Sequence, residues 1–389
     1  MKSKTPVLDF LNEYEKSDIS RLHMPGHKGK SGGFSVPYWL EEAQKFDITE
    51  ISGADNLYNP SGIIMQSEEN AGKIFGAKTL YSTEGSSQAI KAMLYLAEKH
   101  FEKLSTETPY VVASGKCHKA FFHAVELLGL DVKRLDSASD LKASLGTIID
   151  EKKYNPIGVY ITYPDYFGNV SDLKNIKEIL SPFGIPLLVD GAHCAYFKFL
   201  DYTLYPEYIH PVDCGADICC ASAHKTLPTL TGTAYLHIND SLEDVFDEAK
   251  HAMELFGSSS PSYLLIASMD AFNGTAAEYK KAVCAFCEKT KLLKNELSNM
   301  GFNVGKSDPL RIVVLKDDVF TGKDFAACLK NNKCECECFD NDYVIMMLSP
   351  LNDGEDLNRI KEAFLTLKEG KYNPDSSLSD GYSCLDNFK

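Results

Sequence analysis

Residues 219–236, CCASAHKTLPTLTGTAYL, join two apolar runs through a short polar segment. The first run ends at Ser222, and Lys225 follows three residues later, directly after His224. A lysine is costly to bury unless its amine is paired or used in chemistry. A lysine directly after an apolar strand therefore indicates either a side chain that reaches solvent or a reactive amine.

Short apolar segments alternate with helical segments over the first two thirds of the chain. Helices are expected over 86–100, over 119–129 and around 172–180, because apolar residues recur there at helical spacing. Strands are expected at 79–82, 110–114, 157–162, 186–190, 216–222 and 233–238. This alternation predicts an α/β domain with a largely parallel sheet that is covered by helices on both faces.

Polar residues that are able to bind a ligand or take part in catalysis follow five of these expected strands. Parallel sheets bind their ligands beyond the carboxyl ends of the strands, so these positions are the first place to look for a site. The five segments are Thr83–Ser87, Gly115–His118, Tyr163–Gly168, Asp190–His193 and Ser222–Lys225.

Two of these segments suit the binding of charged groups. Gly85, Ser86 and Ser87 open a helix, where free backbone N–H groups and the helix dipole favour an anion such as phosphate. A simple serine N-cap explains the same residues. Asp190 ends an apolar strand, where its carboxylate requires a cation or a hydrogen-bond donor, and a helix cap or a salt bridge is the alternative.

Two further residues suit a flat ligand with a reactive carbonyl. His118 is placed to stack on a ring, although a loop histidine is often structural. Lys225 is placed to form a Schiff base, with a solvent-exposed lysine as the alternative. Together, a phosphate-binding turn, a stacking ring, a carboxylate and an amine match the phosphate, the ring face, the pyridine nitrogen and the aldehyde of one cofactor, pyridoxal 5′-phosphate.

Four segments then resemble a known family. They are RLHMPGHKG (21–29), DITEISGADNLYNPSG (47–62), VDGAHCAYF (189–197) and SAHKTLPTLTG (222–232). In order and spacing they resemble the signatures of the ornithine/lysine/arginine decarboxylase family of fold-type I pyridoxal-phosphate enzymes. The resemblance implies an aspartate aminotransferase-like, mostly parallel seven-stranded sheet with a small α+β C-terminal domain. It also implies decarboxylation of lysine, arginine or ornithine to an amine and CO2.

The resemblance implies a role for each matching residue that contacts the cofactor ring. Lys225 would form the imine with the cofactor aldehyde, and Asp190 would hold the pyridinium proton. His118 would stack on one face of the ring, and Ala192 would lie against the other face. The phosphate would be bound by Ser86, Ser87 and Ser222, with close approach allowed by Gly85.

Other residues are expected near the reacting atoms. His193 and His224 would lie beside the cofactor, and His224 or Lys225 would return a proton to the α-carbon of the substrate. The resemblance also places three residues of the N-terminal arm near the mouth of the site: His23, His27 and Lys28.

The match has departures that leave other functions open. The family pattern is V-D-E-A-H-G-A-H-F where this chain has VDGAHCAYF, so that Gly191 replaces Glu and Tyr196 replaces His. The chain also ends soon after its last expected helix, which predicts a short form without the family's further C-terminal domain. The alternatives are another pyridoxal-phosphate reaction, by an aminotransferase or a lyase, and a catalytically silent cofactor-binding paralogue.

The pattern of expected helices and strands changes after about residue 275. Helices are expected at 275–299, near 323–331 and at 355–368, with strands at 311–315 and 344–350. We therefore expect an N-terminal arm (1–45), a large cofactor-binding domain (46–270), a small α+β domain (271–370) and a polar tail (371–389). Arg311 and Glu337 of the small domain are either charged surface residues or contacts for a substrate.

The composition and charge of the chain limit the kinds of molecule that the protein is expected to bind. The formal net charge of −15 argues against nucleic acid, and no stretch is apolar enough to span a membrane. The N-terminus MKSKTPVLDF lacks a signal-peptide core, so we expect a cytoplasmic protein with its 12 cysteines reduced. Cys334, Cys336 and Cys338 alternate as on one face of a strand, and no metal site is expected. A homodimer is implied by the resemblance.

Overall fold

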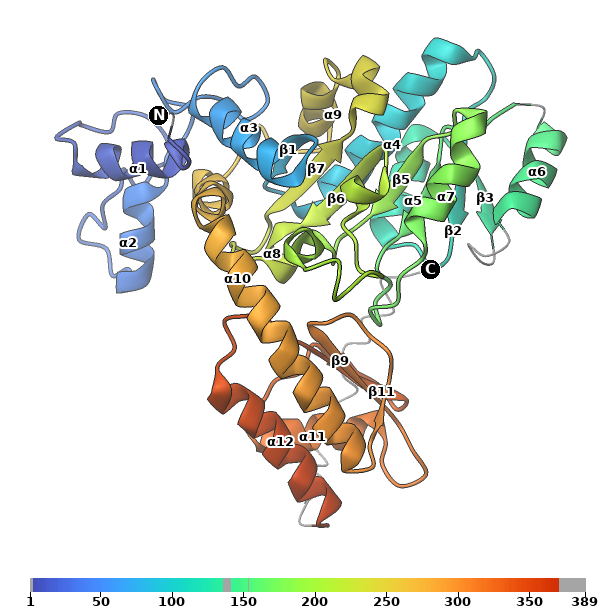
Figure 1. Ribbon diagram of the computed structural model, residues 1–389. Helices are drawn as coiled ribbons and strands as arrows, with labels where there is room; N and C mark the ends of the chain where they lie inside the picture. The colour runs from blue at the N-terminus through green and yellow to red at the C-terminus, as the bar shows by residue number, and fades with distance from the viewer. Residues whose placement is uncertain (1–2, 136–140, 153, 371–389) are drawn as a thin grey trace. The chain divides into compact units, whose positions relative to one another are not determined.

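The computed structural model describes residues 3–135, 141–152 and 154–370, and these residues form two compact units (Figure 1). The predicted polar tail, 371–389, lies outside the described residues. The first unit contains residues up to Tyr163 together with Asp172–Lys198 and Ile209–Ala277. The second unit contains Pro164–Ser171, Phe199–Tyr208 and the chain from Glu278 onward.

The first unit is built on a seven-stranded sheet. Its strands are β1 (Lys78–Ser82), β2 (Tyr110–Ser114), β3 (Asp131–Leu135), β4 (Val159–Thr162), β5 (Leu187–Asp190), β6 (Ile218–Ser222) and β7 (Ala234–Ile238). Their order across the sheet is β1-β7-β6-β5-β4-β2-β3. Only β7 runs against its neighbours, because the short connection from β6 to β7 leaves no room for a crossover. The predicted mostly parallel seven-stranded α/β fold is confirmed.

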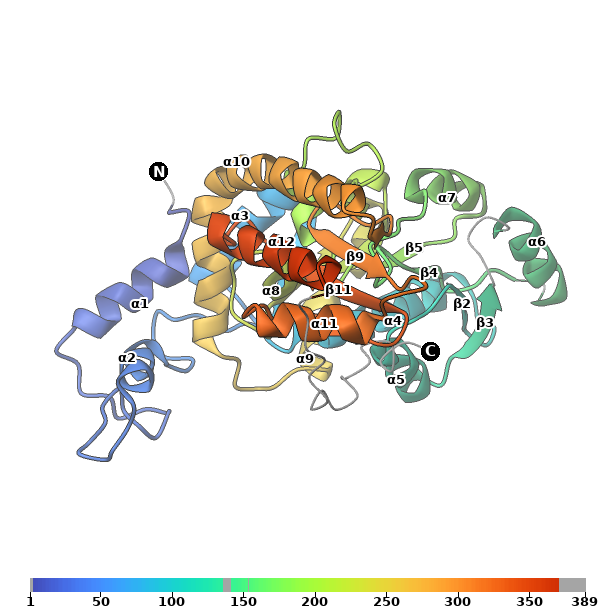
Figure 2. The same ribbon diagram turned by 90° about the horizontal axis from the view of Figure 1, so that it is seen from below.

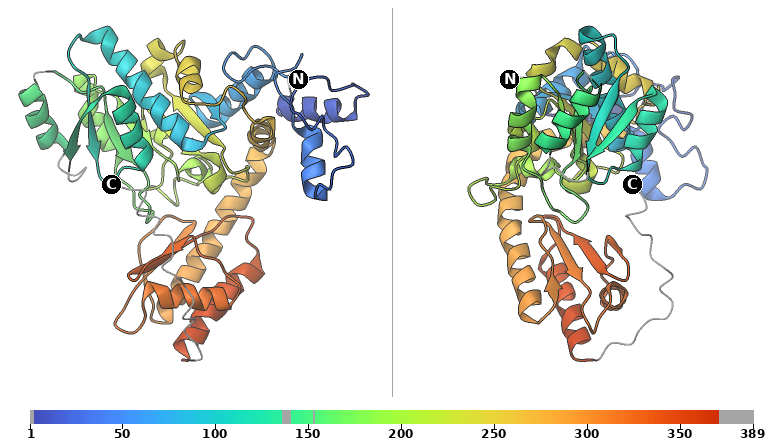
Figure 3. Two further views of the ribbon diagram at one scale, coloured as in Figure 1. Left: turned by 180° about the vertical axis from the view of Figure 1, so that it is seen from behind. Right: turned by 90° about the vertical axis from the view of Figure 1, so that its right-hand side faces the viewer.

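Helices cover both faces of this sheet. The helix α4 lies in front in the view from behind, whereas α7 lies in front in the opposite view (Figures 1 and 3). The helices that begin in the first unit are α1 (Pro6–Lys16), α2 (Tyr38–Phe46), α3 (Ile63–Phe75), α4 (Gly85–Leu104), α5 (Lys119–Leu128), α6 (Leu141–Lys152), α7 (Leu173–Leu180), α8 (Ala223–Thr226), α9 (Ala249–Leu255) and α10 (Tyr263–Asn299). Because helices cover both faces, β2, β5, β6 and β7 are buried throughout.

The N-terminal helix α1 is fixed to the rest of the first unit by one buried carboxylate. Asp270 of α10 accepts hydrogen bonds from the backbone N–H groups of Val7 and Leu8, each at 2.9 Å. Burial raises the pKa of Asp270 to about 6. The following helix, α2, contains no buried residue, and both views place α1 and α2 to one side of α3 (Figures 1 and 2).

The second unit combines a four-stranded antiparallel sheet with helices. Its strands, in the order β10-β11-β9-β8, are β8 (Asn303–Val304), β9 (Arg311–Leu315), β10 (Cys338–Phe339) and β11 (Tyr343–Met347). Its helices are α11 (Gly322–Asn331), α12 (Gly354–Lys368) and the C-terminal part of α10. Phe302 packs against Phe325 and Phe364, with ring centroids 5.9 and 4.9 Å away, at the centre of its core.

Several elements differ from the sequence prediction, among them five helices that were not expected (α1, α2, α3, α6 and α9). The edge strand β3 was not expected, because only Leu135 of its five residues is buried and the segment DVKRL lacks an apolar run. The helix α10 begins at Tyr263, twelve residues before the expected start. The alternating cysteine segment is mostly irregular, and only Cys338 of its three cysteines lies in a strand.

Candidate active site

The carboxyl ends of neighbouring parallel strands bring most of the predicted residues to one edge of the first sheet. Thr162 of β4 lies opposite Asp190 of β5, and Asp190 lies opposite Cys220 of β6. Ser222 ends β6 two residues later, and Lys225 lies in the short helix α8 that follows at once. This edge is therefore the candidate site.

Asp190 is the buried anion of the site. Its side chain is 2% exposed, and its Oδ2 atom accepts a hydrogen bond from the Tyr160 hydroxyl at 2.9 Å. Its Oδ1 atom accepts from the backbone N–H of Ala192 at 3.2 Å and from the thiol of Cys220 at 3.6 Å. These donors compensate the cost of burying the charge, and Ala192 is thereby placed next to the carboxylate.

Lys225 and His193 are in contact. The Nζ atom of Lys225 lies 3.1 Å from Nε2 of the buried His193. The residue Lys225 itself is exposed. Lys225 is therefore accessible to a ligand at the edge of the sheet.

His118 has a structural contact and an electrostatic one. Its Nδ1 atom accepts a hydrogen bond from the backbone N–H of Ala120 at 3.2 Å, so the residue caps α5. Burial lowers its pKa, while the charge of Asp190 acts in the opposite direction and that of Lys225 in the same direction. The cap fixes one edge of a ring that lies within electrostatic reach of both Asp190 and Lys225.

The start of α4 fits a phosphate group. Gly85 adopts a left-handed backbone, with φ of +69°, and its N–H donates to the carbonyl of Gly232 at 2.7 Å. A β-carbon at Gly85 would have no atom within 4 Å, so open space lies beside it. The N-cap residue Glu84 makes no side-chain cap on this helix, and the half-buried Ser86 and Ser87 follow Gly85. The N-terminus of α4 therefore keeps donors for an anion.

Two buried hydroxyl groups strengthen that fit. The Ser222 side chain is fully buried, and its Oγ atom makes no hydrogen bond within the described ranges. The same holds for Oγ1 of Thr83, which directly precedes the α4 turn and was not predicted as a site residue. Ser222 and Ser82 both lie opposite Ala234 of β7, on its two sides, so Ser222 is two strands away from the α4 turn. Buried hydroxyls without partners are costly, which favours an external acceptor at this position.

His224 is held in one tautomer. Its Nδ1 atom lies 2.8 Å from the carbonyl oxygen of Thr233, and a carbonyl only accepts, so Nδ1 carries the proton. Burial lowers the pKa of this imidazole, with the nearby Lys225 acting in the same direction. His224 is consequently a neutral ring whose Nε2 atom is an acceptor at neutral pH.

The arm residues bind elsewhere in the first unit. His23 contacts the Tyr14 hydroxyl at 2.7 Å, and Nε2 of His27 lies 3.1 Å from Oδ2 of Asp47. The Lys28 amine donates to the backbone carbonyl of His23. These contacts order the arm itself, and the expected position of the arm residues near the mouth of the site stays a prediction.

The family-like segment 47–62 has a clear structural role. Its Asp55 accepts backbone N–H bonds from Ser61 and Gly62, both at 2.8 Å, and from Ile64 at 2.9 Å. Burial tends to raise the pKa of Asp55, but these bonds outweigh it, so its pKa is lowered. The charged carboxylate thus closes the loop and caps α3.

Two charged residues of the second unit, Arg311 and Glu337, make polar contacts within that unit. Arg311 is 3% exposed, donates to the carbonyl of Asp165 at 2.9 Å and pairs with Asp308 at 3.3 Å. It is therefore a buried residue and not a surface charge. The Glu337 carboxylate accepts from the Tyr166 hydroxyl at 2.8 Å.

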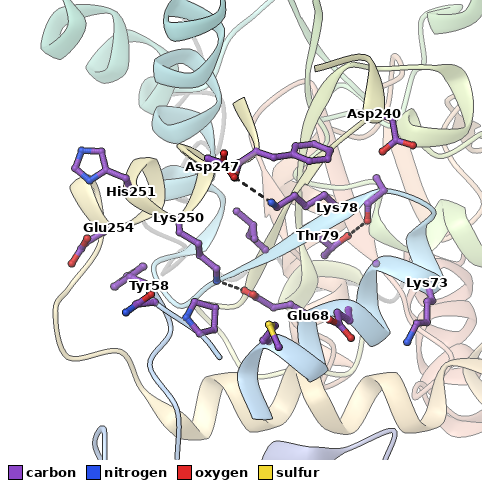
Figure 4. Close-up of a pocket in the computed structure, with 18 of the residues that line it drawn as sticks. Tyr58, Glu68, Lys73, Lys78, Thr79, Asp240, Asp247, Lys250, His251 and Glu254 are labelled. Atoms are coloured by element: carbon purple, nitrogen blue, oxygen red, sulfur yellow. Dashed lines mark hydrogen bonds and ion pairs between the residues drawn. The ribbon is translucent and has the colours of Figure 1, made fainter. Parts of the chain in front are cut away.

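A separate cavity lies at the opposite end of β1. It measures about 1010 Å³ and is lined by α3, α9 and residues 78–80 (Figure 4). Inside it, Lys250 donates to the buried Glu68 at 2.7 Å, and the Lys78 amine donates to the carbonyl of Phe246 at 3.1 Å. Burial raises the pKa of Glu68 and lowers that of Lys78. None of the predicted site residues lines this cavity.

The described residues contain no cluster of three or more His, Cys, Asp or Glu side chains suited to a metal ion. Within the same ranges, no helix combines the length and apolar character that crossing a bilayer requires.

The fold and the strand-end residues define the class of protein. The mostly parallel seven-stranded sheet is shared with solved structures of the fold-type I class. The family model for "Orn/Lys/Arg decarboxylase, major domain" matches residues 5–326, and the chain belongs to that family. The predicted family, fold and cofactor are thus confirmed.

Three individual proteins are similar to this chain. The Bacillus subtilis protein YaaO is 29% identical, over 91% of this chain and 75% of its own length. The arginine decarboxylase of Bacillus subtilis is 26% identical, over 94% and 78%. The lysine decarboxylase LdcF of Francisella novicida has a TM-score of 0.77 at 18% identity, covering 94% of this chain. This chain spans 60% of the LdcF chain, so that likeness concerns the fold.

Proposed function

We propose that the chain decarboxylates a basic amino acid, lysine, arginine or ornithine, to the corresponding amine and CO2. The observation that carries the proposal is that the carboxyl ends of neighbouring strands bring the buried Asp190 and the Lys225–His193 pair to one sheet edge. Membership of the Orn/Lys/Arg decarboxylase family supports it, as does a relative that bears the name arginine decarboxylase.

Each residue has a task in this reaction. When bound, pyridoxal phosphate supplies an aldehyde that reacts with amines and a protonated ring that withdraws electrons. The exposed Lys225 amine would hold the aldehyde, and the buried Asp190 carboxylate would hold the ring proton. The phosphate would accept hydrogen bonds from Ser222 and from the N-terminus of α4, where free donors are available.

The proton balance favours Lys225 over His224 as the donor. The substrate loses its carboxylate as CO2, and one proton must be added to the α-carbon. His224 already donates its Nδ1 proton to Thr233, so its neutral ring has no free proton at Nε2. The Lys225 amine, beside Nε2 of His193, is able to hold and return a proton.

A product screen tests the proposal. Purified protein with added pyridoxal phosphate is given lysine, arginine and ornithine separately, and mass spectrometry measures cadaverine, agmatine and putrescine. One amine well above the others supports the proposal and identifies the substrate. Keto acids without CO2 release would instead indicate another reaction of the same cofactor, and cofactor binding without any product would indicate a silent paralogue.

Two variants serve as controls in this screen. Lys225→Ala should lose both the amine product and the chromophore that borohydride reduces. Asp190→Ala should bind cofactor poorly and lose nearly all turnover, because the ring proton has no partner. Near-parent activity in Asp190→Ala would remove that residue from the proposed role.

We also propose that two copies of the chain associate through the N-terminal arm. The support is a group of large apolar side chains that are strongly exposed, with Leu22 at 92%, Phe34 at 79% and Trp39 at 69%. Exposed apolar groups of this density are typical of an interface. Sedimentation should show a dimer that Phe34→Glu with Trp39→Glu dissociates. The equally exposed Val319, changed to Glu, is the matched control that should leave the dimer intact.

A further inference from the structure

Tyr160 is a buried tyrosine that contacts the predicted cofactor ligand Asp190. Tyr160 lies on β4, two residues before the strand ends, and it pairs in register with Leu188 of β5. Side chains two residues apart on a strand share a face, so Tyr160 and Asp190 project to the same side of the sheet. Both are buried, at 0% and 2% exposure, and the hydroxyl lies 2.9 Å from Oδ2.

Packing fixes the Tyr160 ring. Its centroid lies 4.4 Å from that of Phe121 on α5, with the ring planes tilted by 40°. Burial, and then the negative charge of Asp190, raise the pKa of Tyr160 well above its ordinary value. The phenol consequently keeps its proton, and that proton is donated to the carboxylate.

The contacts of Asp190 restrict both of its oxygen atoms. Tyr160 holds Oδ2, while the N–H of Ala192 and the thiol of Cys220 hold Oδ1. Of these donors, the hydroxyl makes the shortest contact, and a thiol is a weak donor. Each carboxylate oxygen has two acceptor positions, so the two donors fill Oδ1 and one position on Oδ2 remains for a cofactor proton.

We propose that Tyr160 is a positioning residue, which orients the Asp190 carboxylate toward the ring nitrogen of pyridoxal phosphate. This inference rests on the cofactor assignment and does not depend on which reaction the cofactor performs. Without the hydroxyl, the carboxylate is free to turn about its Cβ–Cγ bond toward its remaining donors. The free protein then has to reorient Asp190 before it binds the cofactor, which weakens binding.

The test compares two tyrosine-to-phenylalanine variants on neighbouring strands. Tyr160→Phe removes the Asp190 contact and keeps the ring that packs on Phe121. Tyr110→Phe, on β2, removes the hydroxyl of a tyrosine that is also 0% exposed, and this hydroxyl donates to the carbonyl of Tyr154 at 2.8 Å. The apo forms are titrated with pyridoxal phosphate in the absence of substrate, and the visible absorbance of the bound cofactor is followed with pH.

The expected result is a dissociation constant about tenfold higher in Tyr160→Phe, together with an altered pH titration of the absorbance. Tyr110→Phe should stay within twofold of the parent in both measurements. A Tyr160→Phe constant within twofold of the parent, or lower, overturns the proposal. So does an equal change in both variants, since that would reflect a general loss of stability.

A second variant keeps the test valid if Tyr160→Phe does not fold. Cys220→Ala removes the weaker donor on Oδ1 and leaves the Tyr160 packing intact. It should raise the dissociation constant by about twofold to threefold, and no change would count against a role for the donors around Asp190. Because no substrate is present, a failed amino-acid screen leaves these results unaffected. A parent protein that binds no cofactor would overturn the cofactor assignment and this inference together.

Discussion

The thiol of Cys194 occupies the space in which a β-carbon on Gly191 would lie, and the carbonyl oxygen of Cys220 is 2.7 Å from the same point. The family pattern has Glu at the first position and Gly at the second. The two departures at 191 and 194 therefore form an exchange in space, because the Cys194 side chain fills room that a side chain at 191 would need. The exchange keeps the turn after Asp190 packed.

The first prediction follows from this exchange. Gly191→Ala should lower the free energy of unfolding by about 1–3 kcal/mol, because the methyl group overpacks a buried turn. Adding Cys194→Gly should recover part of this loss, since it removes the thiol from that space and leaves the Cys220 carbonyl oxygen at 2.7 Å. Denaturant unfolding of the two single variants and the double variant gives the coupling energy, and strictly additive effects would contradict the exchange.

The strand pattern of the first unit was predictable because most of its strands are buried on both faces. Such strands read as short apolar runs, as in IGVYIT and PLLVD. The edge strand β3 has no such run, and its pairing with β2 depends on tertiary context. The start of α10 at Tyr263 was missed because propensity is a weak guide to helix boundaries.

The sequence also predicted which residues gather at the strand ends, but it could not predict their contacts. The order β6-β5-β4 brings Tyr160 to Asp190, and strand order is not visible in a linear pattern. The cap that His118 provides for α5 and the exposure of Lys225 depend in the same way on local three-dimensional geometry. One feature of the sequence pointed to Tyr160, namely its position two residues before the end of a strand that leads into the site.

A second prediction concerns Ser222, whose buried hydroxyl has no hydrogen bond within the described ranges. Ser222→Ala should leave the melting temperature of the apo protein unchanged or higher, because it removes an unsatisfied buried group. The same variant should raise the dissociation constant of pyridoxal phosphate about fivefold to tenfold if the phosphate accepts from this hydroxyl. Thermal unfolding and cofactor titration measure the two effects on one sample.

Ser67 is the matched control for this prediction. It is equally buried, but its hydroxyl contacts that of Tyr81 at 2.7 Å and donates to Asp270 at 2.5 Å. Ser67→Ala should therefore lower the apo melting temperature by several degrees, as expected for about 1–2 kcal/mol. If Ser222→Ala destabilises the apo protein as much as Ser67→Ala does, Ser222 has a structural role instead.

The third prediction separates the two candidate proton donors. In His224→Asn, the side-chain amide can still donate to the Thr233 carbonyl, and kcat should fall by less than about tenfold. In Lys225→Ala, kcat should fall by more than about 10³-fold. Because burial lowers the pKa of His224 below its ordinary value of 6.5, His224→Asn should also leave the pH profile unchanged between pH 6.5 and 8. An equal loss in the two variants would restore His224 as a candidate donor.

The last prediction concerns acid stability and two buried histidines. His210 and His237 have ring centroids 5.4 Å apart, and Phe75 packs against His237 at 4.6 Å. Burial lowers the pKa of His210 to about 3 and that of His237 well below its ordinary value. The unfolded chain binds a proton at each residue below pH 6.5, whereas the folded state does not.

Stability should therefore fall as the pH drops below 6.5, by about 1.4 kcal/mol per pH unit for each histidine. Asp270 opposes this trend, because its raised pKa of about 6 lets the folded state bind a proton first. Replacing one histidine isolates its contribution to the loss of unfolding free energy at low pH. Between pH 7 and pH 5, His237→Asn should lose about 2 kcal/mol less of its unfolding free energy than the parent does. Urea unfolding at both pH values measures this difference. His251 is exposed, and His251→Asn is the control that should lose as much unfolding free energy between pH 7 and pH 5 as the parent does. If His237→Asn also loses as much as the parent, the buried pair does not set the acid sensitivity.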